Sequence, residues 1–309
     1  MKAAKADARV VEWTGYTLGA PSTIRLYHHD EAKARAAIQA GLAELSRLEG
    51  IFSLYRSDST IASLNRDGAV DNAPPEFVEM LGRSLFLAKA TDGVFDPTVQ
   101  PVWQLYFRHF TAATVDPAGP SRQDMAAALA LVDWRGVEID AGRGRVAFAR
   151  PGMGLTLNSG AQGYITDKVA DVLRSHGFEK MLIDLDHPRA LSSKPDGSAW
   201  RIGIANPAAP TTAITEIDVV DRAVGSAGGY GTIFDTDGRF THIIDPRDGS
   251  TLPALVGVSV VAETALVADG LATAMLLSPV ERRRELLRAG GGELALFVTP
   301  QGVVSRIEA

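Results

Sequence analysis

The chain contains no cysteine, and this absence removes several kinds of chemistry. Its 309 residues offer no thiol nucleophile, no disulfide and no cysteine-ligated zinc site. Proteins without cysteine occur in both oxidising and reducing compartments, so the composition leaves the compartment open.

The chain also lacks an excess of basic charge. Its net charge is −6, its pI is near 5.6, and it has no run of lysine or arginine. A cationic surface is what draws proteins to nucleic acids, so we expect no nucleic-acid partner. An anionic ligand would need local help from a metal ion or from helix N-termini.

Long apolar runs are missing as well. The N-terminal segment MKAAKADARVVEW has no apolar core of the kind found in signal peptides, and no segment is long enough to span a bilayer. With 46% apolar and 22% charged residues, the chain can form one large domain or two intertwined halves. We expect a single domain over residues 15–309, preceded by a poorly ordered extension over residues 1–14.

Hydrophobic patterning predicts helices and strands in mixed order. The N-cap candidate Asp30 precedes a helix over residues 31–49, and Pro74-Pro75 opens another that ends before Gly93. Without a strict strand-helix-strand rhythm, the order favours an α+β fold with mixed sheets. Further helices are expected at residues 162–175, 265–277 and 280–289. Strands are expected at residues 22–27, 146–148, 181–185, 201–205, 214–220, 241–245, 255–261 and 294–298.

The segment VADGLATAMLL, residues 267–277, places a carboxylate in an otherwise apolar helix. Asp269, Ala272 and Thr273 share one helical face, which brings a carboxylate beside a hydroxyl. Oxygen ligands of this kind suit Mg²⁺. Asp269 can equally pair with a distant arginine or simply lie near a helix start marked by Thr264.

Two further motifs have both a functional and a structural interpretation. In FSLYRSDSTIASLN, residues 52–65, Tyr55 either stacks on a planar ligand or packs in the core, and Ser59 can cap the next helix. In LTLNSGAQGYITDKV, residues 155–169, a strand is expected to enter a glycine turn that opens a helix. Such a turn can present N–H groups to a phosphate or can have no ligand.

Two other segments have the composition of turns. TDGVFDPTVQPVW, residues 91–103, is punctuated by glycine and proline, which indicates a helix exit and a connection. RFTHIIDPRDG, residues 239–249, alternates like a strand that ends in a turn. His242 then shares a face with Phe240 and Ile244, while Asp245 begins the turn. His242 is either a structural histidine or a ligand or base.

Together and in this order, these segments, with SAGGYGTIF, resemble the ApbE family of FAD:protein FMN transferases. The resemblance extends from Gly15 to Val298 and implies an α+β fold with mixed sheets, its helices in two intertwined halves and FAD between them. Within the family, LNSGAQGYITDKVADVLR and PRAL look most like the NosX branch, which is linked to nitrous-oxide respiration.

The resemblance implies a Mg²⁺-dependent enzyme that cleaves FAD and releases AMP. FMN is attached by a phosphoester bond to a threonine in a Ser/Thr-Gly-Ala-Ser/Thr motif of a partner flavoprotein. It implies metal ligands at Ala161, Asp269, Ala272 and Thr273. It implies FAD contacts at Tyr55, Asn158, Ala161, Gln162, Ser226 and His242, and catalytic roles for His242, Asp245 and Asp269.

The chain departs from the family pattern in the glycine turn and beside the flavin. Gln162 replaces a lysine that could hold a phosphate charge, Ser159-Gly160 differs from the usual turn, and Ala227 replaces a serine. The resemblance also implies a periplasmic location, although the chain as given carries no signal peptide. It suggests as acceptor the membrane-bound regulator and electron donor of nitrous-oxide reductase.

Two other functions use the same FAD and metal site. The protein can bind FAD as a carrier or flavoprotein subunit without transferring FMN. It can also be a Mg²⁺-dependent FAD pyrophosphatase that uses water in place of the threonine hydroxyl. Sequence alone leaves both open.

Overall fold

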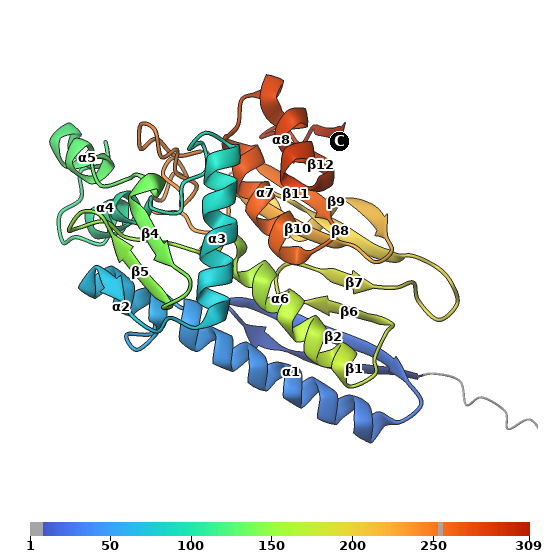
Figure 1. Ribbon diagram of the computed structural model, residues 1–309. Coiled ribbons are helices and arrows are strands. Elements are labelled where there is room, and N and C mark those ends of the chain that lie inside the picture. The colour runs from blue at the N-terminus through green and yellow to red at the C-terminus, as the bar shows by residue number, and fades with distance from the viewer. Residues whose placement is uncertain (1–8, 253–255) are drawn as a thin grey trace, which may run out of the picture.

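The computed structural model describes residues 9–252 and 256–309, which form a large antiparallel sheet with helices packed against it (Figure 1). The sheet has eight strands in the order β1-β2-β6-β7-β10-β11-β12-β13. The α+β class expected from the sequence is confirmed. The strands are β1 (Arg9–Thr17), β2 (Ala20–His28), β6 (Met181–Asp184), β7 (Arg189–Leu191), β10 (Ala223–Gly228), β11 (Gly257–Ala262), β12 (Gly292–Val298) and β13 (Val304–Glu308).

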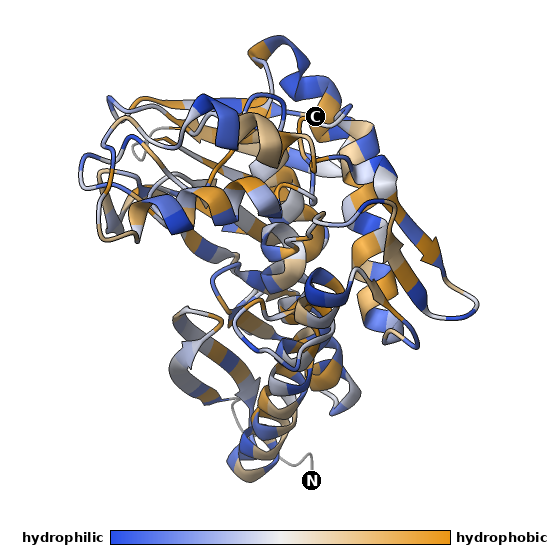
Figure 2. Ribbon diagram, turned by 90° about the vertical axis from the view of Figure 1, so that its left-hand side faces the viewer, coloured by the Kyte–Doolittle hydropathy of each residue, from blue (hydrophilic) through white to orange (hydrophobic). Residues whose placement is uncertain are grey.

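Helices cover one face of this sheet. Asp30 caps the first of them, because its carboxylate accepts the N–H of Lys33 at 3.0 Å. This helix buries an apolar face that includes Ile38, Leu45 and Leu48. Such helices carry alternating apolar and polar bands (Figure 2). In the described part of the chain, no helix is both long and apolar enough to span a membrane. The helices on the sheet are α1 (Glu31–Phe52), α6 (Asn158–Ser175), α7 (Ala265–Leu277) and α8 (Arg283–Gly290), with a 3-10 turn, η2 (Val280–Arg282). A further helix, α3 (Pro75–Ala90), packs on α6, α7 and α8.

A two-stranded ribbon covers part of the opposite face. It consists of β8 (Trp200–Asn206) and β9 (Ala209–Val219), which pair antiparallel. Alternate residues of β8 are buried, as expected for a strand with one face on a core. Trp200 and Ile202 pack there in one cluster with Val224 of β10.

The second half of the molecule lies beside the large sheet (Figure 1). A long loop, residues 229–252, packs on its helix α4, where the hydroxyl of Tyr106 donates to the carbonyl of Gly249 at 2.7 Å. The rings of Phe234 and Phe240 pack against the Tyr106 ring. This half consists of α2 (Thr60–Asp67), β3 (Ala69–Val70), α4 (Gln100–Phe110), α5 (Arg122–Leu129), η1 (Trp134–Gly136), β4 (Val137–Asp140) and β5 (Arg145–Phe148).

Two predicted strands are wrong. Residues 155–157 form an extended loop, because Leu155 pairs its N–H and carbonyl with the side chain of Asn65, and Thr156 donates to the carbonyl of Pro97. Residues 241–245 make isolated bridges rather than a strand. In both places the backbone forms hydrogen bonds to side chains or to single loop residues instead of to a neighbouring strand. The alternation of apolar and polar residues therefore predicts a strand where none forms. Of the strand predicted at residues 255–261, Leu255 lies outside the described residues, and the remainder corresponds to β11.

The expected domain boundary at residue 15 is too late. The chain enters the sheet at Arg9, where β1 pairs with β2 along its whole length. Val11 is buried in the main core, which ties residues 9–14 to the sheet. The extension predicted over residues 1–8 lies outside the described residues.

The helix α4 was not expected. Its segment contains two prolines, which favour a connection, yet Pro101 lies in the first turn of the helix. Proline is tolerated there because the first N–H groups of a helix have no intrahelical partner. Upstream, the carboxylate of Asp96 accepts N–H groups from Thr98 and Trp134, which holds the turn before the helix.

Candidate active site

The centre of the candidate site is Asp269, in the middle of α7. This helix has the bounds expected from the sequence, and Thr264 caps it by accepting the N–H of Val267 at 3.3 Å. Asp269 is 4% exposed and is surrounded by small apolar residues of its own helix. A buried carboxylate needs partners, and they come from other elements.

The backbone of α7 is in direct contact with two neighbouring elements. A Cβ added at Gly163 of α6 would lie 2.3 Å from the carbonyl oxygen of Ala265, and one at Gly225 of β10 would lie 2.2 Å from the backbone nitrogen of Asp269. Glycine at these two positions lets α6 and β10 touch α7 from two sides. Asp269 is therefore held between two rigid elements.

Both oxygens of the Asp269 carboxylate have protein partners. The N–H of Gly163 donates to Oδ2 at 3.2 Å, and Nε2 of His187 lies 3.3 Å from Oδ1. Complete burial disfavours the charged form of the His187 imidazole, whereas the adjacent charge of Asp269 favours it and raises the pKa above its ordinary value. The partner of Asp269 is thus a histidine, rather than the distant arginine that the sequence left open.

The oxygen donors expected for Mg²⁺ fit what is found around Asp269. Thr273 follows one turn later on α7, and its hydroxyl makes no hydrogen bond to the described residues. In contrast, Thr91, Thr166 and Ser278 each donate to the carbonyl four residues earlier. A hydroxyl without a hydrogen-bond partner among the described residues, next to a buried carboxylate, provides two oxygen ligands of the kind that Mg²⁺ binds.

The two remaining predicted metal ligands would contribute backbone carbonyls. Ala272 is fully buried on α7, and Ala161 follows directly after a kink in α6, where Ser159 and Gly160 have non-helical backbone angles. Among residues 9–252 and 256–309, no group of three or more His, Cys, Asp or Glu side chains is arranged to hold a metal ion. A site built on one carboxylate, one hydroxyl and carbonyls is consistent with that finding.

The start of α6 presents the glycine turn. Asn158 is exposed there, whereas the side-chain amide of Gln162 donates to the carbonyl of Leu18 at 3.0 Å, in the turn between β1 and β2. Gln162 therefore links α6 to the turn between β1 and β2. This contact explains how the chain accommodates the departure from the family pattern.

His242 lies in the 229–252 loop beside α7. Its neighbour Ile243 belongs to the buried cluster that contains Ala272. Nδ1 of His242 lies 3.1 Å from the nitrogen and 3.2 Å from the oxygen of Thr232, so the backbone of Thr232 holds the ring in either tautomer. Burial lowers the pKa of His242, more than the Thr232 contact raises it. The ring is therefore neutral at pH 7.

Asp245 begins a tight turn, as expected, and is paired. The guanidinium of Arg247 donates to both of its carboxylate oxygens, at 2.8 and 2.5 Å, and the N–H of Arg247 donates at 2.9 Å. Burial raises the pKa of Asp245, but the bonds from Arg247 outweigh burial and lower it. Asp245 is therefore a weaker base than an unpaired aspartate.

Tyr55 lies in the loop between α1 and α2 and is 86% exposed, so the alternative in which it packs in the core is wrong. Ser59 caps α2 as expected, accepting the N–H of Ala62 at 3.1 Å and donating to the carbonyl of Ser53 at 2.6 Å. This cap fixes the loop and leaves the tyrosine ring free for a ligand.

Ser226 lies on β10 next to the Gly225 contact. Its hydroxyl lies 2.7 Å from that of Ser259 on β11, and its N–H donates to Nδ1 of His187 at 3.4 Å. Ser226 is thereby connected to Asp269 through the imidazole ring of His187. The neighbouring Ala227, which replaces the serine usual in the family, is partly buried against the cluster that contains Ile243.

Asp184, at the end of β6, makes stability depend on pH. Burial, with the nearby charge of Asp186, raises the pKa of Asp184 to about 6. Below pH of about 4 both folded and unfolded chains bind the proton. Between about 4 and 6 only the folded chain binds it, so the free energy of unfolding falls as the pH rises. We expect Asp184→Asn to stabilise the protein by about 3 kcal/mol at pH 7.5 and hardly at pH 3.5, measured by urea unfolding. Equal effects at both pH values would contradict this assignment.

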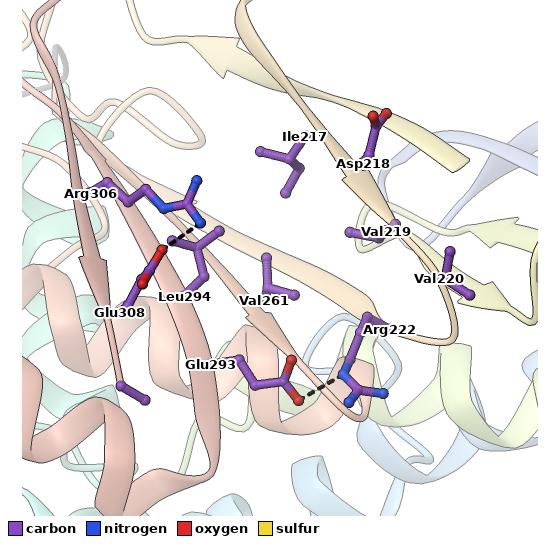
Figure 3. A pocket seen from close by; sticks show the side chains of 11 residues that line it. Ile217, Asp218, Val219, Val220, Arg222, Val261, Glu293, Leu294, Arg306 and Glu308 are labelled. Carbon is purple, nitrogen blue, oxygen red and sulfur yellow. Dashed lines mark hydrogen bonds and ion pairs between the residues drawn. The ribbon is translucent and has the colours of Figure 1, made fainter. Parts of the chain in front are cut away.

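A large cavity lies away from this site. Its volume is about 420 Å³, and it lies between β9 and the last two strands of the large sheet, β12 and the edge strand β13 (Figure 3). Four of its charged side chains form two ion pairs, Arg222 with Glu293 at 2.7 Å and Arg306 with Glu308 at 2.6 Å. None of the residues predicted for FAD or metal lines it, so its size does not make it the site of the chemistry.

Comparisons with known proteins identify the family of this chain. A family model described as the ApbE family matches residues 18–298. The chain belongs to the ApbE family. Two relatives named FAD:protein FMN transferase resemble it over most of their length. The relative from Treponema pallidum (strain Nichols) is 30% identical over 332 residues, covering 97% of this chain and 90% of its own. The one from Klebsiella pneumoniae (strain 342) is 31% identical over 300 residues, covering 95% and 90%.

A solved structure supports the same conclusion. The apo form of the flavinyl transferase ApbE from Pseudomonas stutzeri matches with a TM-score of 0.80 and 27% identity, covering 98% of this chain and 97% of that chain. The predictions of an ApbE-like α+β fold and of a transferase are confirmed at the level of the family.

Sequence reasoning missed the residues that hold Asp269 in this ApbE-family chain. His187, Gly163 and Gly225 all contact Asp269 or its backbone, and none was singled out. No local pattern marks them, because His187 lies in the turn before β7 and meets α7 only through the order of strands in the sheet.

Proposed function

We propose that this chain is a Mg²⁺-dependent FAD:protein FMN transferase. In this reaction a threonine hydroxyl of a partner flavoprotein, within a Ser/Thr-Gly-Ala-Ser/Thr motif, attacks the FMN phosphorus of FAD. The bond between that phosphorus and the bridging oxygen breaks, AMP leaves, and FMN remains attached by a phosphoester bond. The observation that carries the proposal is the buried carboxylate of Asp269 beside the unused hydroxyl of Thr273, in a chain of the ApbE family.

The metal would be held by the Asp269 carboxylate, the Thr273 hydroxyl and the carbonyls of Ala161 and Ala272. When bound, Mg²⁺ supplies positive charge to the pyrophosphate and to the leaving phosphate. The protein supplies the position: α6 and β10 hold Asp269 in place before substrate arrives. Such preorganisation makes charge stabilisation effective in the transition state.

His242 is the better candidate to accept the proton of the attacking hydroxyl. Its pKa is lowered by burial, so the ring is neutral at pH 7, and the Thr232 backbone supports either tautomer. Asp245 is the second candidate, but its pair with Arg247 lowers its basicity. Because the nucleophile belongs to the partner, this chain needs none of its own.

Tyr55 is proposed to stack on the flavin nucleotide, with Asn158, Gln162 and Ser226 lining the FAD site. Since Tyr55 is exposed, Tyr55→Ala should leave the unfolding temperature unchanged. Loss of stacking should raise the Kd for FAD about tenfold, measured by fluorescence titration, while Tyr55→Phe stays near wild type. An unchanged Kd for Tyr55→Ala would place the flavin elsewhere.

The function is tested with purified protein, FAD, Mg²⁺ and an acceptor domain that carries the threonine motif. We expect the acceptor mass to rise by one FMN with stoichiometric AMP, and EDTA or loss of the motif threonine to abolish both. FMN and AMP released without an acceptor would instead indicate a pyrophosphatase. FAD bound but unchanged with two different acceptors would indicate a carrier.

We further propose, from the resemblance of residues 157–174 and 188–191, that the chain belongs to the NosX branch. In that case it acts in the periplasm, and its acceptor is the membrane-bound regulator and electron donor of nitrous-oxide reductase. The same assay tests this proposal when that acceptor is compared with an unrelated domain carrying the same motif. Faster modification of the nitrous-oxide acceptor is expected, and equal rates would contradict the branch assignment.

A further inference from the structure

We propose that His187 is a positioning residue, which orients the Asp269 carboxylate so that its free lone pairs face the metal. This inference rests on the proposed function. His187 does not touch the substrate or the metal itself. It acts through Asp269, from the turn between β6 and β7.

Two protein contacts hold the carboxylate of Asp269. Nε2 of His187 lies 3.3 Å from Oδ1, and the N–H of Gly163 lies 3.2 Å from Oδ2. One partner comes from the sheet and the other from α6, so the two contacts fix the rotation of the carboxylate plane. Each oxygen keeps lone pairs for a cation, since an ionised carboxylate accepts about four bonds.

A further contact fixes the imidazole ring of His187. His187 is 3% exposed, and its Nδ1 accepts the N–H of Ser226 at 3.4 Å. That contact leaves Nε2 as the nitrogen that donates to Asp269. A ligating carboxylate is commonly held in this way by a hydrogen-bond donor behind it, and loss of the donor typically costs 10–100-fold in metal affinity.

Arg189, the first residue of β7, contacts the same helix through Asp167 of α6. Nε of Arg189 lies 3.5 Å from Asp167, whose carboxylate accepts the N–H groups of Ala265 and Leu266 at the start of α7, at 3.0 and 2.9 Å. The start of β7 thus contacts the first turn of α7 through Asp167, and the β6–β7 turn contacts α7 one turn later at Asp269. These two contacts hold His187 and the Asp269 carboxylate in place relative to each other.

Two amide substitutions separate positioning from packing. His187→Gln keeps an N–H donor at about the distance of Nε2, so it can still reach Asp269. His187→Asn places its amide near the position of Nδ1, so it can meet Ser226 but not Asp269. His187→Leu, without any donor, replaces the Asn variant if that variant does not fold. His29→Asn, at an exposed and distant histidine, controls for adventitious metal binding.

The measurement is Mn²⁺ binding to the full chain without FAD, followed by electron paramagnetic resonance. We expect the Kd for Mn²⁺ to rise 10–100-fold in His187→Asn, and to stay within about threefold of wild type in His187→Gln and His29→Asn. Unfolding in EDTA gives the stability of each metal-free variant. In the transfer assay the Asn variant should show a raised KM for Mg²⁺, with kcat largely recovered at high Mg²⁺.

Three results would overturn the inference. Equal Mn²⁺ affinity in wild type and His187→Asn would show that the histidine does not position the ligand, while leaving the transferase intact. Equal losses in the Gln and Asn variants would indicate packing alone. A wild-type chain that binds no Mn²⁺ would remove the metal from the proposed function and this inference with it.

Discussion

Replacing Asp269 by asparagine should reduce FMN transfer at least about 10³-fold. The substitution keeps the size of the side chain and one carbonyl oxygen, but it removes the charge on which the metal site depends. Charge stabilisation by a bound cation contributes several kcal/mol to such reactions, and each 1.36 kcal/mol is a factor of ten in rate. The readouts are acceptor mass and AMP release at saturating FAD.

The control is Asp171→Asn, which removes an exposed carboxylate from α6, where Asp171 pairs with Arg174 at 3.6 Å. Its transfer rate should stay within about twofold of wild type, because exposed ion pairs contribute little. Asp269→Asn must also unfold cooperatively, so that lost activity is not lost structure. Transfer within tenfold of wild type in a folded Asp269→Asn protein would remove Asp269 from the metal site.

The helix that carries Asp269 could be predicted from local signals. Thr264 is a good N-cap, and the following residues are strong helix formers, so α7 has its predicted bounds. The same holds for the Asp30 cap of α1 and the Ser59 cap of α2. In each case the determining hydrogen bond lies within three residues, which is why a single sequence reveals it.

The features that the sequence did not predict correctly depend on contacts between distant segments of the chain. The strand predicted at residues 155–157 is a loop, because the side chain of Asn65 in α2 forms hydrogen bonds with both the N–H and the carbonyl of Leu155. The partner of Asp269 could not be predicted either, because the pairing of His187 with α7 follows from the order of strands in the sheet. Residue patterns indicate that a buried carboxylate needs a partner, but not which segment supplies it.

The position of α7 is therefore set by its neighbours as much as by its own sequence. α6, β10 and the β6–β7 turn contact α7 by backbone approach, hydrogen bond and ion pair, and these contacts converge on Ala265 to Asp269. The oxygen donors of Asp269 and Thr273 can be correctly placed only if these contacts form. A change in backbone distance there should affect stability and transfer together.

Gly225→Ala should lower the free energy of unfolding by at least about 3 kcal/mol. The new Cβ would lie 2.2 Å from the backbone carbonyl carbon of Ala268 and from the backbone nitrogen of Asp269. Overpacking usually costs 1–3 kcal/mol, and a collision with backbone cannot be relieved by a change of rotamer. β10 and α7 must separate, which also displaces the Asp269 carboxylate. Urea unfolding measures the loss.

The matched control is Gly82→Ala in the exposed middle of α3, where an added Cβ meets nothing within 4 Å. Alanine is a better helix former than glycine by about 1 kcal/mol, so this identical substitution should stabilise the protein. The two variants are expected to change stability in opposite directions, and only Gly225→Ala should also reduce transfer. A Gly225→Ala protein within about 1 kcal/mol of wild type would show that α7 is free to move, and the close approach of β10 would then not be what holds Asp269.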